Sequence, residues 1–119
     1  MTKFHKDVLK RIRLTCLDFP DTSEVRAWGH PNFKAGKQTF AVLEEYKADL
    51  SLAIKVPQSR KKTLLQDSRF YDTPYIGNKG WISLKVKAAP VDWMMINDLL
   101  ETSYRLVASK RILKALASH

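Results

Sequence analysis

Few residues in this chain have the types and spacing that catalysis or metal binding requires. The histidines His5, His30 and His119 are widely separated, and none forms an HxxxH pair or a similar zinc-binding spacing. The only cysteine, Cys16, has no second thiol for a disulfide or a thiolate cluster, and its apolar neighbours predict a buried, inert side chain. We therefore expect a protein that is not an enzyme and that binds no metal and no cofactor.

Three further patterns involve chemically useful residues, and none matches a known type of site. His30 precedes Pro31 in a predicted turn and has no visible partner for acid–base work, which favours a local structural role. The glycines, at positions 29, 36, 77 and 80, lack the spacing of a phosphate-binding loop. Glu44 and Glu45 are adjacent, so in a strand they point to opposite faces and do not form a carboxylate pair.

The charge balance is the strongest functional signal in the composition. The chain has 21 Lys and Arg against 12 Asp and Glu, which gives a net charge of +9 and a pI near 9.8. Such an excess favours polyanions, because each phosphate that a cation neutralises releases counterions. Nucleic acid, with duplex DNA foremost, is the expected partner. Because small basic proteins without nucleic-acid partners are common, an acidic protein partner stays open as the alternative.

The remaining composition indicates one soluble domain that covers residues 1–119. The chain is 45% hydrophobic and 28% charged, close to the averages of globular proteins. Its apolar runs are far shorter than the ~20 residues that span a bilayer, and its first residues lead into no secretory segment. We expect a cytoplasmic protein without membrane contacts.

Three segments have helical patterns. Residues 4–17 place apolar side chains on one stripe of an amphipathic helix and cations on the other face. Residues 59–67 predict a short helix with Ser59 as its N-cap, and the cations at 60–62 indicate either an anion site or a tolerated surface. A last helix begins after the N-cap Asp92 and runs nearly to the C-terminus. Its late cations suit the helix dipole, although a basic helix end can also lie beside a phosphate backbone.

The strand patterns complete the predicted fold. Residues 23–28, 32–35, 38–44, 50–56 and 81–87 alternate as strands, with a hairpin turn at Ala35-Gly36-Lys37. Because the strands are apolar on one side only, the economical packing is an α+β two-layer sandwich, in which the N- and C-terminal helices cover one face of an antiparallel sheet. By alternation, the open face should present the following side chains: Arg26, Trp28, Ser51, Lys55, Trp81, Ser83, Lys85 and Lys87. Lysines beside tryptophans suit phosphate contact and base stacking, whereas a tryptophan packed against a loop is the alternative.

Three stretches carry a family resemblance. Residues 28–41 (WGHPNFKAGKQTFA), 74–82 (PYIGNKGWI) and 100–108 (LETSYRLVA) resemble, in the same order, the WGxPxFKxxGKxFA, PYxxxxxWV and ESYxLV patterns of the bacterial MmcQ/YjbR family. The resemblance implies a frataxin-like (CyaY-like) α+β sandwich and DNA binding through two wing-like hairpins. The first wing would hold Lys34, Gly36 and Lys37, and the second would hold Asn78, Lys79 and Trp81.

The resemblance completes the set of candidate residues. Frataxin-type iron sites rely on acidic residues along the first helix, but here that helix has five cations and the single acid Asp7, so iron is disfavoured. The candidate nucleic-acid-binding residues are Arg26, Trp28, His30, Lys34, Lys37, Lys55, Asn78, Lys79, Trp81, Lys85 and Lys87.

Overall fold

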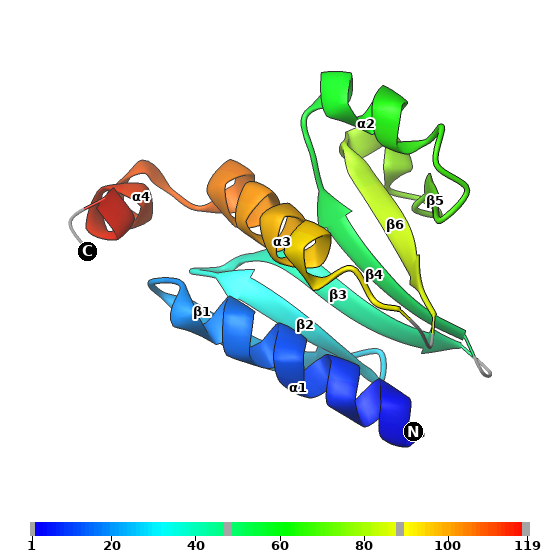
Figure 1. Ribbon diagram of the computed structural model, residues 1–119. Helices are drawn as coiled ribbons and strands as arrows, with labels where there is room; N and C mark the ends of the chain where they lie inside the picture. Colours follow the sequence, from blue (N-terminus) through cyan, green and yellow to red (C-terminus); the bar gives the residue numbers. More distant parts are fainter. Residues whose placement is uncertain (1, 47–48, 88–89, 118–119) are drawn as a thin grey trace.

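Two long helices lie side by side on one face of an antiparallel sheet, as predicted (Figure 1). The computed structural model describes residues 2–46, 49–87 and 90–117. The helices are α1 (Lys3–Asp18), α2 (Gln58–Leu64), the 3-10 turn η1 (Gly77–Lys79), α3 (Trp93–Val107) and α4 (Lys110–Ala117). The strands are β1 (Thr22–Ala27), β2 (His30–Ala35), β3 (Gln38–Tyr46), β4 (Asp49–Lys55), β5 (Phe70–Asp72) and β6 (Trp81–Val86). Their order in the sheet is β1-β2-β3-β4-β6-β5.

The antiparallel pairing puts successive turns at alternate ends of the sheet. One end holds the β2–β3 turn, the last residue of β4 and the start of β6, where Val56 N–H donates to Gly80 O (3.0 Å). Both predicted wings lie at this end, which we call the wing end. The opposite end holds the β1–β2 turn and the last residue of β6. The sheet face away from α1 and α3 is the open face.

Helix α1 forms as its apolar stripe predicts. Val8, Ile12 and Cys16 are buried against the sheet, and the hydroxyl of Thr2 caps the helix by accepting a bond from the backbone N–H of His5 (3.1 Å). Burial raises the pKa of the Cys16 thiol, which agrees with the predicted inert side chain. No helix of the described residues is both long and apolar enough to cross a membrane.

Helix α3 is joined to the sheet through one serine. Asp92 caps its N-terminus, as predicted, by accepting a bond from Met95 N–H (3.1 Å). Further along, Lys55 N–H donates to Ser103 Oγ (2.8 Å), whose hydroxyl donates to Phe40 O (2.5 Å). Phe40 is an extra residue in the β2–β3 ladder, so the hydroxyl bridges backbone groups at an irregular point of the sheet.

The predicted orientation of β1 is wrong. Glu24 lies opposite the fully buried Phe33, and its carboxylate accepts hydrogen bonds from Arg13 of α1 (2.5 and 2.9 Å). Side chains alternate along a strand, so Arg26 points to the helix-covered face with Glu24, and Val25 points to the open face. Trp28 is not in the strand at all, because Trp28 and Gly29 form the β1–β2 turn.

Three further predictions about the helices and strands are corrected. The last helix is interrupted, since the extended backbone of Ala108 ends α3 and α4 begins at Lys110. Strand β5 lies in a segment for which no strand was predicted. Pro57, not Ser59, occupies the N-cap of α2. The predicted connection at residues 46–49 includes residues 47–48, which lie outside the described residues.

Candidate nucleic-acid interface

The first wing is a tight turn held against the neighbouring chain. Gly36 has φ +60, a conformation that favours glycine, and its N–H donates to Asp21 O (2.9 Å). A Cβ at this position would lie 3.6 Å from both Asp21 Oδ2 and Ile112 Cδ1, so the turn is in close contact with α4. Lys37 is exposed beside Gly36, and Lys34 is half-buried on the open face. The predicted residues of the first wing are therefore together.

The second wing is a longer connection that contains η1. Lys61 of α2 anchors it, because its ammonium donates to Gly77 O (2.5 Å) and pairs with Asp72 (2.5 Å). Asn78 and Lys79 are exposed at the tip of this connection. Gly80, with φ +91, then turns the chain into β6. The wing is thus a short helical loop, and it differs from the simple hairpin turn that the sequence predicted.

Lys55 lies between the two wings. It is opposite Trp81 in the β4–β6 register, on the open face. A Cβ on Gly80 would lie 3.5 Å from Lys55 Cε, so the lysine stem passes close to the second wing. Lys34, Lys37, Lys55 and Lys79 share the wing end, and in the described part of the chain none of the four forms an ion pair with an acid.

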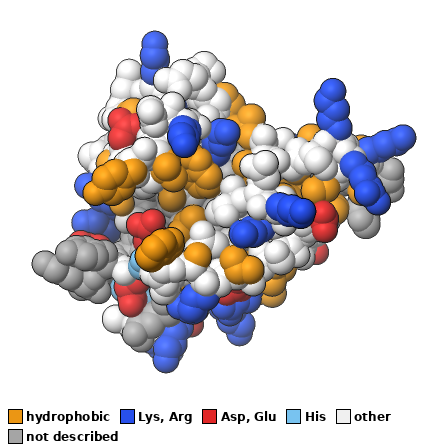
Figure 2. Space-filling model, turned by 180° about the vertical axis from the view of Figure 1, so that it is seen from behind, with side chains coloured by type: hydrophobic (Ala, Val, Ile, Leu, Met, Phe, Trp, Pro, Cys, Tyr) orange, Lys and Arg blue, Asp and Glu red, His pale blue; other side chains and the backbone are white. Residues whose placement is uncertain are grey.

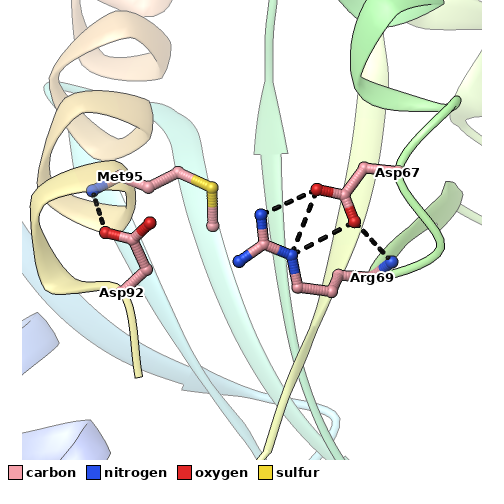
Figure 3. A network of polar contacts seen from close by, with 4 residues as sticks. All are labelled: Asp67, Arg69, Asp92 and Met95. Carbon is pink, nitrogen blue, oxygen red and sulfur yellow. Dashed lines mark hydrogen bonds and ion pairs between the residues drawn. The ribbon is translucent and has the colours of Figure 1, made fainter. Parts of the chain in front are cut away.

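Other cations are engaged within the fold. Arg69 donates to both carboxylate oxygens of Asp67 (2.7 to 3.1 Å), near the N-cap Asp92 of α3 (Figure 3). These bonds lower the pKa of Asp67 to about 2. At the start of α2, Arg60 pairs with Asp98 and donates to Thr102 (3.0 Å), while Lys61 is buried. The sequence offered an anion site or a tolerated surface for the α2 cations, and neither describes Arg60 and Lys61, because both are paired within the fold.

The remaining predicted residues lie elsewhere. Trp28 is 96% exposed at the opposite end of the sheet, and Arg26 donates to Gly29 O (2.9 Å), which braces that turn. His30 is half-buried at the start of β2, and the exposed Lys87 follows β6, also at the opposite end. The sequence placed Arg26 and Trp28 on the same open face as Lys55, and the structure does not.

The middle of the open face is less polar than predicted. Ser83 is buried and hydrogen-bonded to Thr73 (2.9 Å), and the hydroxyl of Tyr71 donates to Ser51 (2.8 Å). Lys85 is exposed, with its ammonium 5.8 Å from the centroid of the Tyr71 ring. Figure 2 shows this face: Lys and Arg side chains are spread among hydrophobic ones and gather on the protruding α4.

Helix α4 carries the late cations for which the sequence allowed two interpretations, a match to the helix dipole or a basic helix end beside a phosphate backbone. Because α3 ends at Val107, α4 turns toward the first wing, and the exposed Lys110 and Arg111 lie at the wing end. Ser109 is the signal that was missed, since its hydroxyl accepts a bond from Ile112 N–H (3.3 Å) as an N-cap does.

The fold and the wings define an α+β sandwich of one particular family. The YjbR family model matches residues 17–106, most of the chain, so this protein belongs to the YjbR family. The structure is also similar to the crystal structure of the Deinococcus radiodurans protein DR2400, described as domain DUF419. The TM-score is 0.77 at 22% identity, over 92% of this chain and 87% of that one, and this likeness supports the fold alone. A search of curated proteins finds no match.

Proposed function

We propose that this YjbR-family protein is a non-enzymatic, cytoplasmic DNA-binding protein that contacts duplex phosphates with little sequence preference. The observation that carries the proposal is the group of four lysines at the wing end, Lys34, Lys37, Lys55 and Lys79, which pair with no acid among the described residues. Cations without internal partners are the ones that release counterions when they neutralise phosphates. Strands β2 and β4 fix the backbone of Lys34 and Lys55, and the two wings fix that of Lys37 and Lys79, so the backbone needs little ordering on binding.

The separation of the wings suits a duplex. The first wing joins β2 to β3 and the second joins β5 to β6, so their midpoints are about three strand spacings apart, roughly 14 Å. The major groove of B-DNA is ~12 Å wide. The two wings can therefore contact phosphates on the two strands that border one groove, with Lys55 between them.

The proposal assigns no catalytic step to the protein. The Cys16 thiol is buried and its pKa is raised, so it is a poor nucleophile. The buried His5 is already bonded to Glu45. Phosphate contacts from lysine ammonium groups need neither a metal nor a cofactor.

A direct test is fluorescence anisotropy of a labelled random-sequence duplex over a range of salt concentrations. Lys34→Ala with Lys37→Ala should weaken binding about tenfold near ~0.1 M salt and reduce the slope of log K against log salt by about 2, equally on every sequence. The matched control is Lys3→Ala with Lys6→Ala, which removes the same charge from exposed positions on α1. Equal losses in both variants would mean that net charge, and not the wing, determines the affinity.

A second candidate function is binding of an acidic protein through the open face. The arrangement that favours it is the pairing of cations with aromatic rings there, with Lys55 opposite Trp81 and Lys85 near Tyr71. An acidic polypeptide with the same charge as the duplex separates the two candidates in the same assay. Tighter binding to the duplex favours the DNA proposal, and equal or tighter binding to the polypeptide favours the protein partner.

A further inference from the structure

Helix α4 and the first wing enclose a groove of about 710 Å³ at the wing end. Lys37 and Gln38 line it from the turn, Arg111 and Ile112 line it from α4, and Asp21 lines it from the α1–β1 connection. These segments are far apart in the sequence, and the hinge at Ala108 brings them together.

The two sides of α4 have different roles. Ile112 is 9% exposed and belongs to the core, and Leu113 packs against that core. Lys110 and Arg111 are exposed, and at about 100° per residue Lys110 lies nearly opposite Ile112 and Arg111 nearly opposite Leu113. Packing of the apolar side holds α4 beside the first wing. The positions of Lys110 and Arg111 are therefore fixed by the fold.

The charges around the groove are unbalanced in favour of an anion. Lys37 and Arg111 both line it, and neither has an ion-pair partner among the residues that the structure describes. Asp21 is the acid among the lining residues, and its carboxylate lies beside Gly36. A guanidinium side chain and an ammonium side chain that line one groove are suited to a phosphate, which accepts several hydrogen bonds at once.

We infer that α4 is part of the DNA interface, and that its groove receives a backbone phosphate of the duplex between Lys37 and Arg111. The inference rests on the proposed function and extends it to an element outside residues 17–106, the part matched by the family model. In this arrangement α4 adds phosphate contacts beside the first wing and lengthens the contact along the duplex. Asp21 repels the same phosphate and limits the affinity.

The first test removes the cations of α4. Lys110→Ala with Arg111→Ala, measured by anisotropy on the labelled duplex, should reduce the salt slope by about 2 and weaken binding about tenfold near ~0.1 M salt. Lys3→Ala with Lys6→Ala is again the charge-matched control and should change both values less. Circular dichroism spectra and melting curves of each variant establish that the fold is retained, since all four positions are exposed.

The second test increases the affinity and so does not depend on damage to the fold. Asp21 has φ +57, a conformation that asparagine adopts readily, so Asp21→Asn keeps the backbone and removes the negative charge. This variant should bind the duplex several-fold more tightly than the wild-type protein. In the triple variant with Lys110→Ala and Arg111→Ala, the gain should shrink, because the phosphate at the groove keeps Lys37 but has lost Arg111 and is held less closely.

These measurements distinguish a failure of the α4 contact from a failure of DNA binding as a whole. If the wing variant Lys34→Ala with Lys37→Ala loses affinity while the α4 variant matches its control, the role of α4 is refuted and the proposed function stands. If the wild-type protein fails to bind the duplex even at low salt, the proposed function falls and the inference about α4 falls with it. An unchanged affinity for Asp21→Asn contradicts the placement of a phosphate in the groove.

Discussion

The ammonium of Lys61 lies 2.5 Å from the carboxylate of Asp72, and only the lysine is buried. The side chain of Asp72 is 63% exposed, whereas Lys61 is 6% exposed and also donates to Gly77 O. One buried lysine thus connects α2, the end of β5 and the start of the second wing. Burying a cation without partners is costly, and here two charge-assisted hydrogen bonds from Lys61 offset that free-energy cost.

Replacing Lys61 should loosen the second wing. Lys61→Met retains most of the packing but loses both bonds, so we expect a loss of about 1.5–3 kcal/mol in the free energy of unfolding. Urea denaturation measures this loss, and hydrogen exchange should speed up first at residues 77–80. Lys62→Met is the control, since Lys62 is the exposed neighbour, and it should change stability by less than about 0.5 kcal/mol.

Ser103 should be equally specific in its effect. Ser103→Ala leaves the N–H of Lys55 and the carbonyl of Phe40 without their hydroxyl partner in a buried place, which should cost about 1–3 kcal/mol. Thermal unfolding checks the value, with Ser23→Ala on the exposed side of β1 as the control. A neutral Ser103→Ala variant would show that the strands close up and bond directly.

Local patterns predicted most of the helices and strands correctly, and the errors come from contacts between distant residues. The stripe of α1, the cap of α3 and the alternation of β6 are properties of short segments. The orientation of β1 depends instead on Glu24, which points toward the helices because its carboxylate accepts hydrogen bonds from Arg13 of α1. The alternation favoured Val25 and Ala27 as the buried side of that strand. Because β1 is an edge strand, these two side chains can instead lie on the open face.

In the candidate site, too, the local patterns were predicted correctly and the contacts between distant residues were not. The first wing follows from the glycine turn and its lysines, so its cations were predicted. The burial of Lys61 depends on Asp72, eleven positions away on another element, and no local pattern reveals it. The position of α4 depends on the extended backbone at Ala108, where neither glycine nor proline marks the break. Its cations were therefore noticed, but their place beside the first wing was not.

The pair of Asp67 and Arg69 gives a pH-dependent prediction (Figure 3). The pKa of Asp67 is lowered from 3.8 to about 2 by hydrogen bonds from Arg69. A lowered pKa means that the ionised form favours folding, so its contribution is complete above pH 3.8 and is lost as the pH falls toward 2. The melting temperature of the wild type should exceed that of Asp67→Asn near neutral pH, and the gap should narrow across this window.

The same pair can be followed directly by NMR. The carboxyl carbon of Asp67 should titrate at about pH 2 in the wild type. In Arg69→Leu its midpoint should rise part of the way toward 3.8, the ordinary value of an aspartate, because the backbone N–H of residue 69 still donates to Asp67. A low midpoint that persists in Arg69→Leu would point to a cause other than Arg69.

Trp28 should make the protein less stable than asparagine would at the same turn position. It has φ +56 in a two-residue turn before Gly29, a conformation in which asparagine is favoured, and at 96% exposure its ring gains almost nothing from packing. Trp28→Asn should therefore raise the free energy of unfolding by about 0.5–1 kcal/mol, measured by urea denaturation.

The same variant, tested against the labelled duplex and a labelled single strand, shows whether the Trp28 ring contributes to binding. Weaker binding from a more stable protein would assign the exposed ring to recognition, because stacking on a base is worth about 1–3 kcal/mol. Unchanged binding would confine the DNA contacts to the wing end.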